Sequence, residues 1–192
     1  MAARFAPPVR HYDLAALAPG AQGFSSNNAL AAALAEIVRM APAGRRVRRL
    51  SARRSQHGTA IEALRFSRGP GRPLVQLLGQ QHGDEPATAE ALLLTTRALA
   101  TGDLAPLRDH IDVTVLPRAN PDGAELQRRR AADGLDINRD HLLLRTAEAC
   151  AVAGMLRGQR RWWSTPTNTR CSAATWRSSM RCSATTCCCS KR

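Results

Sequence analysis

"RPLVQLLGQQHGDEPATAEALLL", residues 72–94, is the segment from which the predicted fold of this chain follows. It opens with a continuous apolar run, which is typical of a strand buried in a sheet. A short polar turn comes next, Pro86 suits the first turn of a helix, and alanine and leucine then continue from Ala87 to Ala100. A strand, a turn and a helix in this order predict an α/β protein with helices on the faces of its sheet.

The flanking segments continue this alternation of strands and helices. Capping residues followed by good helix formers favour a helix, and alternating apolar and polar residues favour a strand. We therefore predict helices over 24–42 and 140–158, a strand pair over 45–55 and 60–67, and a further strand over 110–123 that ends in Pro-Gly turn chemistry.

Length and charge restrict the class of protein. A chain of 192 residues can form one domain with a proper core, and none of its apolar stretches is long enough to cross a bilayer. The first residues lack the apolar region and cleavage site of a secretory signal, so we expect a cytoplasmic protein. The net charge of +13 is compatible with an acidic partner such as nucleic acid.

The composition changes near residue 159. Residues 159–192 contain seven basic side chains and no acidic one, with five of the six cysteines and all three tryptophans. This tail has no apolar periodicity, and its cysteine spacings match no ligand pattern. We predict a globular region over 1–158 and a disordered tail over 159–192.

A histidine and a glutamate occupy the turn after the predicted buried strand. His82 and Glu85 lie at the end of a sheet where α/β proteins usually build their sites. An imidazole nitrogen and a carboxylate oxygen are suitable zinc ligands, and a catalytic zinc commonly has three protein ligands and one water. Taken alone, the pair favours a capped, exposed turn, because a match this short needs context.

Further motifs along the chain supply that context. The sequence Asn-Pro-Asp-Gly at 120–123 follows a predicted strand, and the sequence Gly-Leu-Asp-Ile-Asn-Arg follows at 134–139. In this order the three motifs resemble the zinc carboxypeptidases, peptidase family M14, over roughly residues 40–157. The resemblance implies a mixed sheet flanked by helices, with residues 1–158 forming a truncated N-terminal portion of the catalytic domain.

The resemblance also implies roles for individual residues. His82 and Glu85 match the first two ligands of Zn²⁺, and Asp136 matches the carboxylate that holds the ligand histidine by its other ring nitrogen. Asn138 and Arg139 match the pair that receives the terminal carboxylate of the substrate, which suits the planar fork of a guanidinium. Without the neighbouring motifs, Asn138 and Arg139 would more simply cap the next helix or face solvent.

An arginine that polarises the scissile carbonyl is the remaining implied group. Arg129 is our choice because it lies five residues before Gly134, where shorter members of the family place this arginine, although Arg128 and Arg130 are close competitors. The three arginines are also compatible with a plain solvated basic run, and residues 120–123 with a purely structural turn.

Two parts of the implied machinery are missing from the sequence. The family requires a third zinc ligand, a histidine, and a glutamate that acts as general base. No histidine follows His141, which we expect to be packed or exposed and not a ligand. His11, His57 and His110 have no motif around them.

The unusual tail suggests a reason for this absence. If residues 162–169 are back-translated with codons rich in G and C and read in a shifted frame, they give Val-Val-Asp-Ala-His-Glu-Tyr, an apolar strand that ends in histidine. We therefore hypothesise that the tail from about residue 159 is out of frame, through a frameshift or a sequencing error.

Two functions of different class follow from these observations. The first is a zinc-dependent carboxypeptidase that hydrolyses a C-terminal peptide or acyl-amino-acid bond, here weakly active or inactive, with no nucleic-acid or membrane partner. The second is a basic, non-catalytic protein that binds nucleic acid or an acidic partner, for which salt-sensitive binding would be expected.

Overall fold

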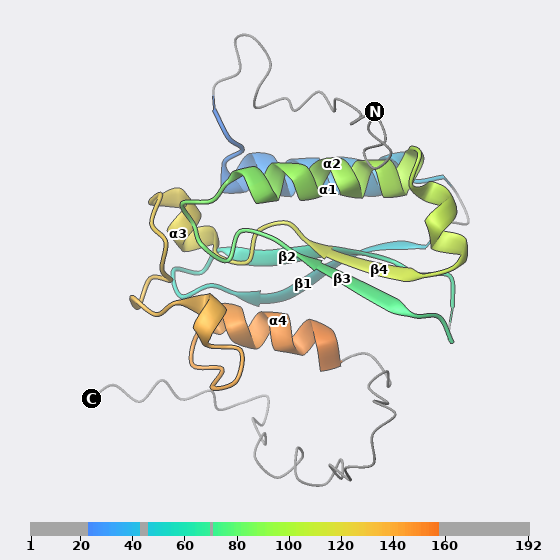
Figure 1. The fold of residues 1–192 in the computed structure, drawn as a ribbon. Coiled ribbons are helices and arrows are strands. Elements are labelled where there is room, and N and C mark those ends of the chain that lie inside the picture. The colour runs from blue at the N-terminus through green and yellow to red at the C-terminus, as the bar shows by residue number, and fades with distance from the viewer. Residues whose placement is uncertain (1–22, 43–45, 70, 158–192) are drawn as a thin grey trace, which may run out of the picture. The chain divides into compact units, whose positions relative to one another are not determined.

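The computed structural model describes residues 23–42, 46–69 and 71–157 (Figure 1). They form a four-stranded sheet in the order β1-β2-β4-β3 with helices on both faces. The elements, in chain order, are α1 (Asn27–Met40), β1 (Val47–Arg54), β2 (Ala60–Phe66), β3 (Leu74–Leu78), α2 (Ala87–Thr101), the 3-10 helix η2 (Ala105–Asp109), β4 (Asp112–Leu116), α3 (Pro121–Glu125), the 3-10 helix η3 (Ile137–Arg139) and α4 (Ala147–Arg157).

The sheet is mixed, as the family resemblance implied. β1 pairs with β2 and β2 with β4 in antiparallel register, whereas β3 and β4 are parallel and are joined by the crossover helix α2. Because parallel strands end at the same edge of a sheet, the loops after β3 and β4 leave side by side. The backbone pairing continues past both strands, with Ala119 N–H donating to Gly79 O and Asn120 N–H to Gln80 O, each at 3.0 Å.

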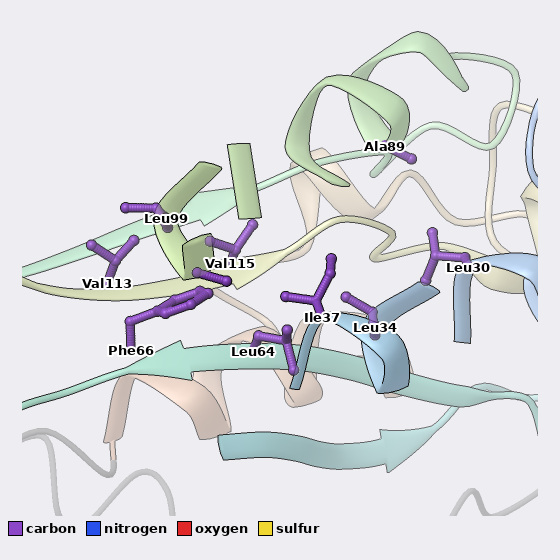
Figure 2. Packing of buried hydrophobic residues seen from close by; sticks show 10 residues of the cluster. Leu30, Leu34, Ile37, Leu64, Phe66, Ala89, Leu99, Val113 and Val115 are labelled. Carbon is purple, nitrogen blue, oxygen red and sulfur yellow. The ribbon is translucent and has the colours of Figure 1, made fainter. Parts of the chain in front are cut away.

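Two apolar cores lie on opposite faces of the sheet. Helices α1 and α2 pack on β2 and β4 on one face (Figures 1 and 2), and α4 packs on the other. The first core contains Leu30, Leu34, Ile37, Leu64, Phe66, Ala89, Leu99, Val113 and Val115. The second contains Ile61, Ala63, Leu116, Ala119, Ala151, Val152 and Met155.

The apolar run over 72–80 does not form a fully buried strand, contrary to the prediction. Among the described residues, β3 pairs only with β4 and lies at the edge of the sheet, which leaves Val75 38% exposed. The run therefore has the composition of an interior strand in an edge position.

The predicted helix over 140–158 begins later than expected. Asp140 accepts hydrogen bonds from both the backbone N–H (2.6 Å) and the hydroxyl (2.9 Å) of Thr146, and this closes a loop that ends where α4 starts. Leu142 and Leu143 lie in that loop and are 84% and 69% exposed. The sequence pattern is that of an apolar helical face, but the local side-chain hydrogen bonds prevail.

Some predictions fall on residues that the structure does not describe. The tail over 159–192, the boundary at 158 and His11 lie outside the described residues, so these remain predictions. Within the described part of the chain, the helices are too short or too polar to cross a membrane.

Candidate metal centre

The loop between β3 and α2 places His82 close to the loop after β4. Gly83 N–H donates to Arg129 O at 3.3 Å, and a Cβ built on Gly83 would lie 2.1 Å from Gly123 C and 2.4 Å from Arg128 O. These neighbours are backbone atoms, which cannot rotate away as a side chain would. Gly83 therefore permits a contact between two backbones that the site requires.

His82 is buried, and each of its ring nitrogens faces a carboxylate. Nδ1 lies 3.1 Å from Glu85 Oε1, and Nε2 lies 3.2 Å from Asp136 Oδ1. The imidazole thus connects the turn before α2 with the turn before η3, which is 54 residues away in sequence. The side chains of His82 and Glu85 converge.

Asp136 is held in its ionised form. Burial alone would raise the pKa of Asp136, but the Asn138 N–H, the hydrogen bond and charge of His82, and the charge of Arg139 together lower that pKa. Its Oδ1 accepts the Asn138 N–H at 2.9 Å as well as facing His82. Because an ionised carboxylate can only accept, Asp136 favours the tautomer of His82 that carries its proton on Nε2, while Glu85 faces Nδ1 of the same ring.

Arg129 is the arginine that reaches this pair. Its Nη1 lies 3.2 Å from Glu85 Oε1, the same oxygen that faces His82. Its competitor Arg130 donates instead to Gly134 O at 3.1 Å, within its own turn. Arg129 therefore contacts Glu85, and its role on the scissile carbonyl stays a prediction.

Asn138 and Arg139 lie in η3, next to Asp136, and both are exposed. Buried Ile137 anchors the turn, and Arg139 Nη1 donates to Asn138 O at 3.2 Å. The charge of Arg139 acts on Asp136, so the predicted carboxylate-binding pair is adjacent to the group that holds His82.

Asn120 has a larger part in the site than its turn motif indicated. Its Oδ1 accepts the Gly123 N–H at 2.9 Å and caps α3, while its Nδ2 donates to Gln81 O at 3.3 Å and to Arg129 O at 3.4 Å. Asn120 therefore ties the loop of His82 to the segment of Arg129. The Asn-Pro-Asp-Gly motif was the signal in the sequence, although we interpreted it as a structural turn.

A buried arginine behind the loop was missed altogether. Arg118 donates to Gln80 Oε1 (2.7 Å), Asn27 Oδ1 (2.8 Å) and Ser25 O (2.7 Å), and burial lowers its pKa despite the nearby charge of Glu90. Gln80 has a positive φ of 40° and also donates to Gly83 O. No periodicity marks such a residue in the sequence, because its three partners come from distant segments.

The histidine after the motif does not join the pair. His141 Nε2 lies 2.6 Å from Gln81 Oε1 and the side chain is exposed, as expected. Within the described ranges, no set of three histidine, cysteine, aspartate or glutamate side chains converges as a metal site would require.

The donor pair nevertheless suits zinc. Ligands about 2.0–2.2 Å from a tetrahedral zinc lie roughly 3.3–3.6 Å from one another. The observed 3.1 Å between His82 Nδ1 and Glu85 Oε1 is close to that separation. His82 and Glu85 thus have the atom types and the separation that two of the three protein ligands of a catalytic zinc would need.

Comparison with known proteins gives consistent matches. A sequence model described as zinc carboxypeptidase, Peptidase_M14, matches residues 31–186. The chain is 43% identical over 72 residues to carboxypeptidase 2 of Trichophyton rubrum, covering 36% of this chain and 13% of that protein. It is 33% identical over 109 residues to carboxypeptidase E of Caenorhabditis elegans, covering 45% and 23%.

Solved structures show the same fold. Carboxypeptidase A of Helicoverpa armigera superimposes with a TM-score of 0.62 at 21% identity, covering 72% of this chain and 43% of that one. The metallo-carboxypeptidase of Pseudomonas aeruginosa, solved with (2-guanidinoethylmercapto)succinic acid, gives a TM-score of 0.57 at 26% identity and covers 71% and 37%. The chain therefore spans less than half the length of these relatives.

Proposed function

This chain belongs to the zinc carboxypeptidase family, peptidase M14, and on that premise we propose that it is part of a zinc-dependent carboxypeptidase acting on the free carboxyl end of a peptide or acyl-amino acid. The observation that supports this most strongly is the convergence of His82 and Glu85, with Asp136 on the far side of the imidazole. The family match favours this function over a basic, non-catalytic binding protein.

We assign the metal to Glu85 and the Nδ1 atom of His82. Asp136 keeps the His82 proton on Nε2, so Nδ1 is available as a ligand. When bound at such a site, zinc lowers the pKa of a water molecule towards neutrality and polarises a carbonyl group.

The other residues act on the substrate. Arg129 donates hydrogen bonds to the oxygen of the scissile carbonyl, on which negative charge develops in the transition state. Arg139 binds the terminal carboxylate through its planar fork, and the Asn138 amide adds a directional hydrogen bond. Asn120 and Gly83 position these groups by holding the two loops together.

We expect this chain to bind zinc weakly and to hydrolyse peptides slowly at best. The sequence has no histidine, aspartate or glutamate after Glu148, so the third ligand and the general base of the family have no counterpart there. Two protein ligands hold zinc less firmly than three, and an activated water needs a base to take its proton.

Zinc uptake tests the assignment. The purified chain is titrated with zinc in competition with a chromophoric chelator, and His82→Ala is compared with His110→Ala, an exposed histidine outside the site. The weak uptake of zinc should be lost in the first variant and kept in the second. Equal uptake by both variants would reject His82 as a ligand.

Binding of a terminal carboxylate tests the substrate-binding pair. A short peptide with a free carboxyl end should bind the chain, and its amidated form should bind at least tenfold more weakly. Arg139→Ala should remove this preference, whereas Arg130→Ala, whose guanidinium bonds within its own turn, should keep it. A preference that survives Arg139→Ala would contradict the role.

A further inference from the structure

A row of polar side chains crosses the sheet on the face covered by α4, away from the proposed zinc ligands. The strand registers align Arg48 of β1 with Arg65 of β2, Arg65 with Thr114 of β4, and Thr114 with Gln76 of β3. Directly opposed residues lie on the same face of a sheet. The row continues the face that carries Ala63 and Leu116, which pack under α4.

The first two members of this row are both positively charged. Arg48 and Arg65 are directly opposed across β1 and β2, an arrangement that destabilises a strand pair through repulsion. Arg46 lies two residues before Arg48, and Ser67 N–H donates to Arg46 O at 3.1 Å, so a third guanidinium enters on the same side. Among the described residues, neither Arg46 nor Arg48 forms an ion pair.

These arginines surround a hollow in the surface. Its volume is about 290 Å³, and its lining consists of Arg46, Arg48, Leu50, Arg65 and Ser67. Arg65 and Ser67 are held in place by Asp112: Arg65 Nη2 lies 3.6 Å from the carboxylate, and Ser67 Oγ donates to it at 2.7 Å. The contacts with Asp112 therefore hold Arg65 and Ser67 in position, and the arginines that line the hollow supply hydrogen-bond donors.

Unpartnered polar atoms continue the row beyond the hollow. Thr114 is 1% exposed, and its hydroxyl has no hydrogen-bond partner among the described residues. The amide nitrogen and oxygen of Gln76 are likewise buried without a partner. Buried polar groups normally find partners, but Thr114 and Gln76 do not line the hollow, so the proposed site consists of the arginines and Ser67 alone.

We propose that the hollow binds a phosphate group through Arg48 and Arg65, with Arg46 at its rim. A tetrahedral oxyanion offers several acceptor oxygens to the planar forks of two guanidiniums. Its charge also offsets that of Arg48, which lies opposite Arg65, whereas Arg65 itself already faces Asp112. The site is independent of the proposed zinc ligands, and its ligand is either free phosphate or a phosphate monoester.

Calorimetric titration of the full chain with inorganic phosphate, at an ionic strength held constant with sodium chloride, tests this site. Arg48→Gln should weaken phosphate binding at least tenfold. Arg53→Gln is the matched control, because it removes an arginine from the same strand that does not line the hollow, and it should change binding less than twofold. Circular dichroism and melting temperature establish that both variants are folded.

Two further titrations identify the source of the anion and test whether it binds at the hollow or at Arg139. Phenyl phosphate that binds as tightly as inorganic phosphate assigns the hollow to a phosphate carried on a larger molecule, and tenfold weaker binding assigns it to the free anion. Arg139→Gln should leave phosphate binding intact. The proposal would be overturned if Arg139→Gln lost phosphate binding while Arg48→Gln kept it. It would also be overturned if Arg48→Gln and Arg53→Gln abolished phosphate binding equally.

Discussion

Replacing Gly83 by alanine should separate the two loops that form the candidate metal centre. The added Cβ would lie 2.1 Å from Gly123 C, 2.4 Å from Ala124 N and 2.4 Å from Arg128 O. Normal contact requires about 3.4 Å or more between such atoms, so one backbone must move by roughly 1 Å. Overpacking of this kind costs about 1–3 kcal/mol of unfolding free energy.

A second glycine provides the control for this substitution. Gly154 lies on the exposed side of α4 with no atom within 4 Å of its Cβ position. Gly154→Ala should therefore raise the unfolding free energy by about 0.5–1 kcal/mol, because alanine loses less backbone entropy in a helix. The two variants make the same chemical change and should shift stability in opposite directions.

Thermal and chemical denaturation measure the difference. At about 2–4 °C per kcal/mol for a chain of this size, Gly83→Ala should melt roughly 2–12 °C below the parent protein. Zinc affinity should fall as well, because the shift carries His82 away from Asp136, now 3.2 Å distant. A Gly83→Ala protein with unchanged melting temperature and zinc affinity would refute the close approach of the two loops.

Three further substitutions test other parts of the structure. Burial, reinforced by the charges of Asp122 and Asp133, raises the pKa of Glu148. The folded state therefore loses stability as the pH rises from the carboxyl pKa of the unfolded chain through the pKa of the folded one. In denaturation experiments, Glu148→Gln should leave stability unchanged in acid and raise it at neutral pH. Asp136→Asn should weaken zinc binding about 10- to 100-fold, as a competition titration would reveal. Leu34→Ala, in the core under α1, should cost about 2–5 kcal/mol in denaturant unfolding and leave the zinc ligands in place.

Much of the fold could be predicted from local patterns. The helix α1, the hairpin of β1 and β2, and the order strand, loop, helix around His82 agree with the structure because apolar periodicity and capping residues act over short distances. The predicted start of α4 was wrong because the hydrogen bonds that Thr146 donates to Asp140 close a loop within an otherwise helical pattern.

The residues of the candidate site were likewise predicted where a local motif marked them and missed where only distant contacts did. The motifs around His82 and Asp136 identified residues that the fold brings to hydrogen-bond distance. The edge position of β3 was not predicted, because strand order depends on which segments pair and not on the composition of one strand. Arg118 was missed because its partners lie 38, 91 and 93 residues away.

The backbone pairing that runs past the ends of β3 and β4 restricts how this site can vary. Gly79 and Gln80 remain in step with Ala119 and Asn120, so His82 follows at a fixed offset from the paired positions. A single inserted residue before Gln80 would break that phase and turn the imidazole away from Asp136. We therefore expect this site to tolerate many single substitutions better than it tolerates an insertion or a deletion. Insertions and deletions should be confined to segments outside 79–85 and 117–120.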